Sequence, residues 1–285
     1  MFSDVRRKAL SRSSCIVIAG LILFMWTAAT ATADDMVNAV VNAYSLVQPV
    51  PNPGSAIGTD TAKAYEFQSQ VVEGLKGRWG EVIGYKGGLT SEQAQKRFGL
   101  SSPVYGVLFA AGVQKSGSVI PRDDFIRPFL ETEIGFVMKK TITKPVASTD
   151  ELKKMIAGVC PVFELPDMAF ADMKNITAAD IIGANVGARM IVKGKVRPLS
   201  ALSKVADPIV VKLGNEVYVE GKPTDAMGNQ LEALKWVVNE VVKNGGSVKK
   251  GNLIITGALG GMKPLKPGKY VANYGGLGTL TFTAK

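Results

Sequence analysis

The apolar positions of the first hundred residues repeat mainly at helical intervals. One apolar stripe runs through residues 34–47, and a second spans 61–77. Spacings of three and four place such residues on one face of a helix, so both segments are expected to be helical. A short strand is expected at 81–85, and a further helix at 90–98 with Thr90 as its N-cap.

Beyond residue 100 the pattern of apolar and polar positions predicts mainly strands. The strands are expected from 125 to 138, at 158–165, at 181–182 with 185–193, in a hairpin over 208–220, and at 253–256, 269–274 and 279–283, with helices at 148–157 and 232–243. These elements predict an α+β fold, in which a helical N-terminal region over 34–100 precedes a β-rich domain over 101–285.

The first 33 residues have the pattern of a secretory signal peptide. A basic start precedes an uncharged run from Cys15 to Trp26, and Ala31-Thr32-Ala33 then forms a small-x-small cleavage site. We expect a cut after Ala33 and a periplasmic or secreted mature protein that is not bound to a membrane. The alternative is an uncleaved N-terminal anchor, because residues 15–33 are just long enough to reach across a bilayer.

The composition restricts the chemistry of any active site. The chain has 285 residues, of which 46% are hydrophobic and 20% charged, as in ordinary globular proteins. It contains no histidine, which excludes Ser-His-Asp triads, Cys-His dyads and histidine-ligated zinc. A bound metal must therefore use carboxylate and carbonyl oxygens, which suit hard cations such as Mg²⁺, Mn²⁺ or Ca²⁺.

Charge and cysteine content exclude further classes. Without the four basic residues and one acidic residue of the signal, 30 basic and 23 acidic residues remain, a net charge of +7. The lysines are scattered without interleaved aromatic residues, so a nucleic acid is not an expected partner, and the charge favours small anions or simply solubility. Cys160 remains alone after cleavage, which excludes an intramolecular disulfide, and its apolar neighbours predict burial.

An acidic strand is the first candidate site. Alternation over residues 131–138 places Glu131 and Glu133 on one face, about 7 Å apart, where they repel by about 0.6 kcal/mol in water. In a buried cleft the repulsion grows, and a divalent cation between them reverses its sign. A solvated strand face is the alternative. Gly135 favours the site, because a glycine leaves room for an approaching group.

Two further residues join this candidate site. Glu164 stands alone in an apolar strand, where an unpaired carboxylate is costly, so it is a candidate metal ligand unless it faces solvent on an edge strand. Lys86 lies among glycines directly after a strand, and such a lysine can bind a carboxylate or exchange a proton. The alternative is a surface lysine in a turn. The glycines at 257–261 and 275–278 lack the context of a nucleotide site and are expected to form turns.

The order of these motifs resembles one family. The matching segments are GYKGGLTS, PVYGVLF, FLETEIGFVM, VFELPD, GANVGARMIVKG, GNQLEALKWVVNEV, LIITGALGG and YGGLGTLTF, which together cover roughly residues 36–285. They resemble the 2-hydroxypentadienoate (2-oxopent-4-enoate) hydratase and 4-oxalocrotonate decarboxylase group of the fumarylacetoacetate hydrolase superfamily. The acidic pair followed about 30 residues later by a third glutamate is the specific part of the resemblance.

The resemblance implies a mixed β-roll fold and a metal-dependent lyase that forms a homo-oligomer. Glu131, Glu133 and Glu164 would hold Mg²⁺ or Mn²⁺, which would chelate the 2-oxo oxygen and a carboxylate oxygen of a small anionic 2-oxo acid and stabilise its enolate. Lys86 would be the catalytic residue, as carboxylate partner or proton-transfer group. In the hydratase, ketonisation of the dienol precedes water addition at the far carbon, whereas in the decarboxylase the enolate follows CO₂ loss.

The chain also departs from the family pattern. Val104 stands where an aspartate is usual, Ala258 and Gly260 replace two hydroxyl residues, and Gln230 replaces a proline. The metal ligands are kept while polar groups around the substrate are missing. From the resemblance and the kept metal ligands, we expect a hydratase of a short 2-hydroxydienoate or 2-oxo acid. The alternatives are an oxalocrotonate-type decarboxylase, a C–C hydrolase, or an exported binder of keto acids that has lost turnover.

Overall fold

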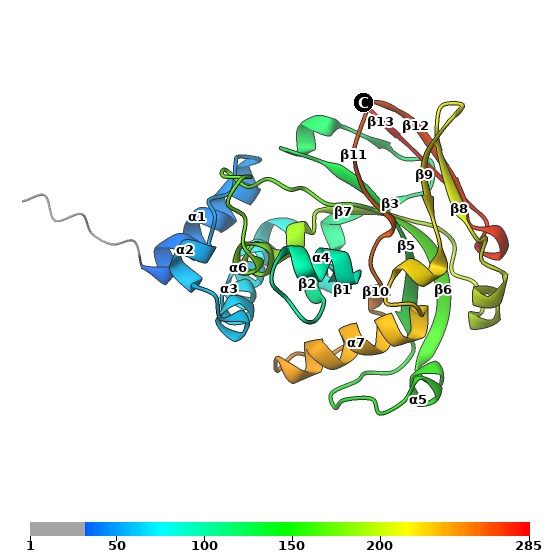
Figure 1. The fold of residues 1–285 in the computed structure, drawn as a ribbon, viewed down its shortest axis with the longest axis horizontal. Helices are drawn as coiled ribbons and strands as arrows, with labels where there is room; N and C mark the ends of the chain where they lie inside the picture. Colours follow the sequence, from blue (N-terminus) through cyan, green and yellow to red (C-terminus); the bar gives the residue numbers. More distant parts are fainter. Residues whose placement is uncertain (1–31) are drawn as a thin grey trace, which may run out of the picture. The chain divides into compact units, whose positions relative to one another are not determined.

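The computed structural model describes residues 32–285, and the expected signal sequence lies almost entirely outside these residues. The described residues belong to one compact unit. The unit combines curled mixed sheets with a group of N-terminal helices (Figure 1), which confirms the expected α+β class. None of its helices is both long enough and apolar enough to cross a membrane.

The N-terminal helices pack beside the sheets, together with a helix from later in the chain (Figure 1). They are α1 (Ala33–Leu46), α2 (Gly54–Ile57), α3 (Thr61–Trp79) and α6 (Ala178–Gly183). Thr32 caps α1, because its side chain accepts from the backbone of Asp35 and the Asp35 carboxylate accepts from the backbone of Thr32. The remaining helices are α4 (Glu92–Arg97), α5 (Thr149–Lys153) and α7 (Gln230–Lys243).

The larger sheet has eight strands and carries the candidate site. Its order is β2 (Val104–Phe109), β1 (Val82–Gly88), β10 (Leu253–Ile255), β5 (Phe129–Met138), β6 (Ile156–Leu165), β7 (Met190–Lys193) and β3 (Val113–Lys115), with β11 (Leu259–Pro264) paired to β5 outside this path. Because β1 lies between β2 and β10, residues on both sides of position 100 build this sheet.

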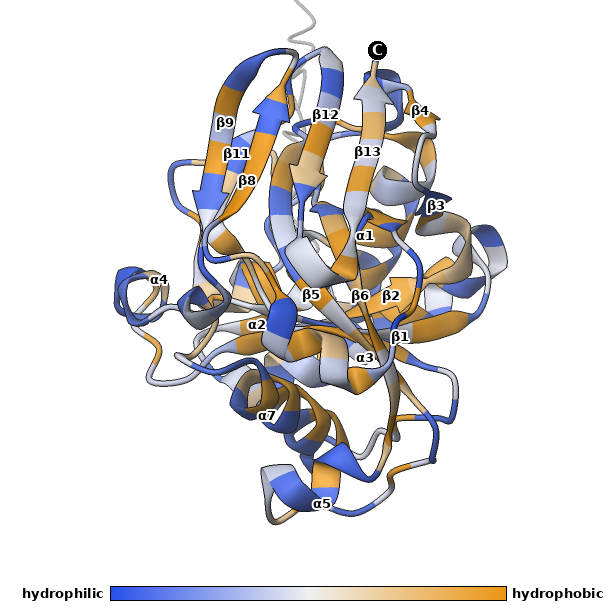
Figure 2. Cartoon of the chain, turned by 90° about the vertical axis from the view of Figure 1, so that its right-hand side faces the viewer, coloured by the Kyte–Doolittle hydropathy of each residue, from blue (hydrophilic) through white to orange (hydrophobic). Residues whose placement is uncertain are grey.

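The smaller sheet covers the larger one through a shared apolar core. Its order is β4 (Val119–Ile120), β13 (Thr279–Ala284), β12 (Gly268–Asn273), β8 (Ile209–Leu213) and β9 (Glu216–Gly221). Hydrophobic and hydrophilic residues alternate along these strands (Figure 2), as expected for a sheet with one buried face. Phe282 of β13 packs edge-on against Phe163 of β6, which joins the two sheets.

The larger sheet curls until its first strand meets its last ones. A separate apolar cluster forms inside the curl and includes Leu108 of β2, Cys160 and Val162 of β6, and Ile191 of β7, together with Leu253 and Ile255 of β10 and Ala188. We call this cluster the floor cluster. Cys160 is fully buried in it, which confirms the expected burial of this residue.

Three local predictions are wrong. In the strand expected at 181–182 with 185–193, residues 181–182 belong to α6, residues 185–187 form a 3-10 helix, and only 190–193 are extended. A short apolar run does not by itself distinguish a buried helix from a strand. The helix predicted over 90–98 is capped by Ser91, whose side chain accepts from Ala94, whereas Thr90 is buried. The glycines at 257–261 do not form only a turn, because Leu259 starts β11 and pairs with Thr132.

The contact between β1 and β10 yields a stability prediction. A Cβ atom on Gly84 would lie 1.8 Å from the carbonyl oxygen of Leu253, so Gly84→Ala should separate the two strands. We expect the free energy of unfolding in urea to fall by about 3 kcal/mol or more, the upper end for overpacked sites. Gly77→Ala is the matched control, because a Cβ atom there meets nothing within 4 Å on α3 and should stabilise the helix by about 0.5–1 kcal/mol. Equal stability of the two variants would contradict the β1–β10 contact.

Candidate metal centre

Strand register brings two glutamates face to face. β5 and β6 pair antiparallel, with Glu131 directly opposite Glu164 and Glu133 opposite Val162. Side chains opposed in this way have Cβ atoms about 5 Å apart. At that separation two ionised carboxylates repel by about 3 kcal/mol for an effective dielectric constant near 20. Like charges in direct cross-strand opposition are destabilising unless a cation lies between them.

The three predicted ligands form one cluster. Glu133 and Glu164 are fully buried, Glu131 is half-buried, and one carboxylate oxygen of each lies within 4.8 Å of the others. The solvated strand face considered for Glu131 and Glu133 is therefore wrong, and so is the edge-strand position considered for Glu164, since β6 lies between β5 and β7. Three carboxylates at this spacing could hold one metal ion.

Lys86 reaches the same cluster from β1. Its side chain is 3% exposed, its Nζ atom forms an ion pair with Glu164, and it donates to the carbonyl oxygen of Val186 at 3.1 Å. Gly106 on the neighbouring strand makes room for it, because a Cβ atom there would lie 3.1 Å from Cγ of Lys86. The alternative of a surface lysine in a turn is therefore wrong.

Two carboxylate oxygens in the cluster lack a hydrogen-bond donor. Oε2 of Glu133 accepts from the backbone of Gly257 at 2.6 Å, which fixes this carboxylate. Oε1 of Glu133 and Oε2 of Glu164 are buried without a donor among the described residues, and Oε1 of Glu164 is buried with the Lys86 ion pair in place of a regular hydrogen bond. Buried polar atoms are almost always satisfied, so these oxygens leave the cluster with acceptors that a further group could use. Gly257 has a φ of 108°, and a Cβ atom there would lie 2.4 Å from Oγ1 of Thr90, so glycine is required.

Burial and neighbouring charges shift the pKa values of the residues in the cluster. Burial raises the pKa of Glu131 to about 8, with the nearby Glu164 charge adding to the effect and Lys86 opposing it. Burial, followed by Glu164 and Glu131, also raises the pKa of Glu133 well above its usual range. Burial disfavours the charged form of Lys86, but the three glutamates outweigh it and keep the lysine pKa raised. The lysine is therefore positively charged at neutral pH.

The charge of the cluster fits a divalent cation. Three ionised glutamates and one ammonium leave a net charge of −2, which a single divalent ion neutralises. All the donor atoms are carboxylate oxygens, the ligands preferred by Mg²⁺, Mn²⁺ and Ca²⁺. The residues present thus fit a hard divalent ion in both charge and donor type.

The floor cluster lies beside the glutamates on the inner face of the curled sheet. Val162, Cys160 and Ile255 lie on the same face of the curled sheet as the glutamates. The space expected above Gly135 is not free for a ligand, because a Cβ atom there would already lie 2.9 Å from Leu253 and from Val162. Gly135 therefore allows the floor to pack, and the prediction that it leaves room for an approaching group is wrong.

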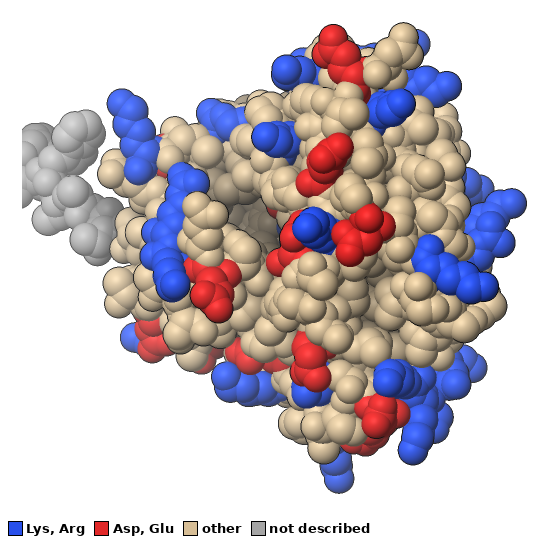
Figure 3. Space-filling model, turned by 45° about the vertical axis from the view of Figure 1, so that its right-hand side comes forward, with Lys and Arg blue, Asp and Glu red and all other residues tan. Residues whose placement is uncertain are grey.

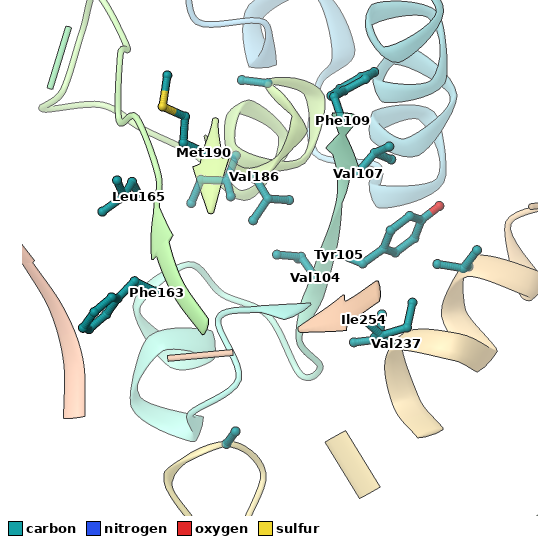
Figure 4. Close-up of a cluster of buried hydrophobic side chains, with 14 of the residues drawn as sticks. Val104, Tyr105, Val107, Phe109, Phe163, Leu165, Val186, Met190, Val237 and Ile254 are labelled. Atoms are coloured by element: carbon teal, nitrogen blue, oxygen red, sulfur yellow. The ribbon is translucent and has the colours of Figure 1, made fainter. Parts of the chain in front are cut away.

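One wall of the site is apolar. Phe163 and Leu165 lie on one side of β6, whereas Val104 and Val186 lie on the other (Figure 4). Strand alternation places Glu164 on the side of the two valines. Val104 is 2% exposed, so the position where the family pattern has an aspartate is a buried apolar contact. The surface is hollowed on one face, with acidic and basic side chains at the rim (Figure 3).

Two of the other departures from the family pattern, Gln230 and Gly260, have structural roles. Gln230, at the start of α7, accepts from the hydroxyl of Thr256 at 2.6 Å and donates to the carbonyl oxygen of Pro223. Gly260 cannot carry a hydroxyl side chain, because a Cβ atom would lie 2.0 Å from the carbonyl oxygen of Glu220. Asn185 and Thr256 were not singled out by the sequence pattern. For Asn185 the signal was present, because Asn-Val-Gly contains two residues that tolerate left-handed turns.

The chain matches no protein-family model, but it is similar to characterised enzymes. It is 32% identical over 232 residues to a 2-keto-4-pentenoate hydratase of Burkholderia vietnamiensis, covering 79% of this chain and 87% of that protein. It is 30% identical to a 2-keto-4-pentenoate hydratase of Paraburkholderia phymatum, covering 78% and 85%. A 4-oxalocrotonate decarboxylase of a Pseudomonas species is 25% identical, covering 76% and 82%.

Solved structures show the same fold. The 4-oxalocrotonate decarboxylase of Pseudomonas putida G7, complexed with magnesium and adipate, superposes with a TM-score of 0.82 at 22% identity, covering 89% of this chain and 97% of that one. A yeast fumarylacetoacetate hydrolase family protein superposes with a TM-score of 0.53 at 12% identity, covering 70% and 91%. These likenesses confirm the expected β-roll architecture.

The raised pKa of Glu131 predicts how the metal-free protein responds to pH. Its folded-state pKa of about 8 exceeds the ordinary value of 4.5, so the folded state binds this proton more tightly than the unfolded state. That contribution is present in full below pH 4.5 and is lost as the pH rises through 8. In the presence of a chelator, the free energy of unfolding should therefore fall between pH 5 and 9, and Glu131→Gln should flatten the fall. A flat profile for the unsubstituted protein would contradict a crowded, buried cluster.

Proposed function

Because the chain belongs to the 2-keto-4-pentenoate hydratase and 4-oxalocrotonate decarboxylase group of the fumarylacetoacetate hydrolase superfamily, we propose that it is a metal-dependent hydratase of a short 2-hydroxydienoate or 2-oxo acid such as 2-oxopent-4-enoate. The observation that carries this function is the buried cluster of Glu131, Glu133 and Glu164 with Lys86. The family supplies the reaction class, and the cluster supplies the groups that such a reaction needs.

The three glutamates are the proposed ligands of one Mg²⁺, with Mn²⁺ as the alternative ion. When bound, such an ion acts as a Lewis acid that polarises the 2-oxo group and stabilises negative charge on its oxygen. Glu133 is held by the backbone of Gly257 and Glu164 by Lys86, so two of the three ligands are fixed before a metal binds. A site organised in this way loses little energy to rearrangement on binding.

Lys86 is the proposed partner of the substrate. Its ammonium is buried and positively charged, and it lies against the same carboxylate that would ligate the metal. With Glu164 also ligating a cation, the Lys86 ammonium would be less strongly held by this carboxylate and would be available to bind a substrate carboxylate or to transfer a proton. The floor cluster excludes water from below, which strengthens these charged contacts.

A second candidate reaction is decarboxylation of an oxalocrotonate-like diacid. The observation that favours it is Val104, which is buried and apolar and cannot activate water for addition at the far carbon. Loss of CO₂ also leaves an enolate on the 2-oxo group, but it needs no added water. A protein that binds keto acids without turnover is the third reading, and it rests on the same missing polar groups.

We also propose export with removal of the N-terminal segment. The basic start, the apolar run and the small-residue site ending at Ala33 support it. The position of the cut affects α1, because Thr32 caps this helix and a cut after Ala33 removes the cap. Ala29-Thr30-Ala31 is a second small-x-small site, and a cut after Ala31 keeps the cap.

The hydratase proposal predicts metal-dependent turnover. With Mg²⁺, the protein should consume 2-hydroxypenta-2,4-dienoate, followed by loss of the dienol absorbance together with formation of the hydrated product. Glu133→Gln should lower kcat/KM by about 100-fold or more and should abolish stabilisation by Mg²⁺, which reaches about 2.7 kcal/mol at 100 times Kd. Formation of CO₂ from an oxalocrotonate-like diacid without hydration would favour the decarboxylase. Metal-dependent binding of both substrates without turnover would contradict either enzyme.

The export proposal predicts a shortened chain in the periplasm or medium. N-terminal sequencing of the recovered protein should give Asp34 as the first residue for the cut after Ala33, or Thr32 for the cut that keeps the helix cap. An N-terminus at Met1 in protein recovered from membranes would instead support the uncleaved anchor.

A further inference from the structure

A strained turn lies beside the proposed active site. Asn185, Val186 and Gly187 are consecutive residues with φ values of 54°, 54° and 64°, all in the left-handed region. Glycine adopts this region readily and asparagine tolerates it, but a β-branched residue such as Val186 is a genuine outlier there. Outliers of this kind persist only where the surrounding structure holds them, and they cluster at functional sites.

The turn presents one carbonyl group to Lys86. The carbonyl oxygen of Val186 accepts from Nζ of Lys86 at 3.1 Å. Among the described residues, this oxygen and the Glu164 carboxylate are the two acceptors that the buried ammonium contacts. In a regular helical or extended backbone the carbonyl would point elsewhere, so the left-handed conformation of Val186 determines where the ammonium is held.

The side chain of Asn185 holds the turn in place. Its Oδ1 accepts from the backbone of Val107 at 2.7 Å, and its Nδ2 donates to the carbonyl oxygen of the same residue at 2.9 Å. Asn185 is 1% exposed, so no water replaces these bonds. Gly106 completes the fit, because a Cβ atom there would lie 2.8 Å from the backbone oxygen of Asn185.

We propose that Asn185 is a positioning residue for Lys86, acting through the carbonyl group of Val186. Its two hydrogen bonds to Val107 hold the left-handed turn against β2, and the turn aims the ammonium at the substrate carboxylate or at the carbon that receives a proton. This inference rests on the proposed role of Lys86 in the reaction. The metal ligands stand on β5 and β6 and not on this turn, so Asn185 acts on them only through Lys86 and its ion pair with Glu164.

A double-mutant cycle tests the proposal, with kcat/KM measured for Asn185→Ala, Lys86→Met and the double variant in the presence of Mg²⁺. We expect Asn185→Ala to lower kcat/KM by about 10-fold or more when Lys86 is present, and by no more than about 2-fold when it is replaced by Met. The Kd for Mg²⁺, measured by calorimetry, should change no more in Asn185→Ala than in Lys86→Met, because Asn185 acts on the ligands only through the lysine. If turnover by Lys86→Met is too slow to measure, the Kd for oxalate in the presence of Mg²⁺ replaces kcat/KM in the cycle. It is measured for the unsubstituted protein, the two single variants and the double variant.

Asn239 offers a matched control. It makes the same pair of bonds to one backbone residue, accepting from Val146 at 2.7 Å and donating to its carbonyl oxygen at 3.0 Å, but it lies on α7 and these bonds involve no residue of the site. Asn239→Ala should therefore lower thermal stability as Asn185→Ala does while leaving kcat/KM unchanged.

Two results would overturn the role of Asn185. In the first, Asn185→Ala lowers kcat/KM by the same factor whether position 86 is Lys or Met. In the second, Asn185→Ala has the same kcat/KM as Asn239→Ala. Unchanged turnover in Lys86→Met itself would be a different failure, because it would remove the proposed role of the lysine.

Discussion

The opposition of Glu131 and Glu164 across two paired strands is the interaction on which the rest of this structure depends. Strand register fixes both residues on the inner face of a curled sheet, and Glu133 is the next residue on that face. Burial removes the water that would screen three carboxylates, and one lysine offsets only part of their charge. The cluster therefore favours the proton or a divalent cation. Either one lowers the negative charge of the cluster, and a bound cation would in addition supply Lewis acidity.

Residues around the three glutamates and Lys86 hold these side chains in position. The floor cluster keeps water from one side, and Gly135 permits its close packing. Gly257 turns its backbone donor toward Glu133, and Gly106 leaves the volume that Lys86 occupies. The turn at Asn185 adds a rarer element, because a valine is unfavourable in the left-handed region and is held there by contacts that include the bonds of Asn185 to β2. The backbone of this turn is therefore in an unfavourable conformation at the point where it holds Lys86.

Alternation over residues 131–138 was sufficient to predict a strand with Glu131 and Glu133 on one face, and a single carboxylate in an apolar run was sufficient to single out Glu164. The pairing of Glu131 with Glu164 was not predictable from these patterns, because register depends on how two strands meet in space. Residues 181–182 were misassigned for a related reason, since their burial in α6 comes from packing against α3. The role of Gly135 was missed because its neighbours Leu253 and Val162 are distant in sequence.

Proton release on metal binding tests the central claim most directly. With the pKa of Glu131 raised to about 8, this residue is largely protonated at pH 7 and must lose its proton when a divalent ion binds. Calorimetric titration with Mg²⁺ in two buffers of different ionisation enthalpy measures that release. The account predicts one ion per chain with at least one proton released at pH 7, because the pKa of Glu133 is raised as well as that of Glu131. Binding of Mg²⁺ without proton release at pH 7, or no binding at all, would contradict it.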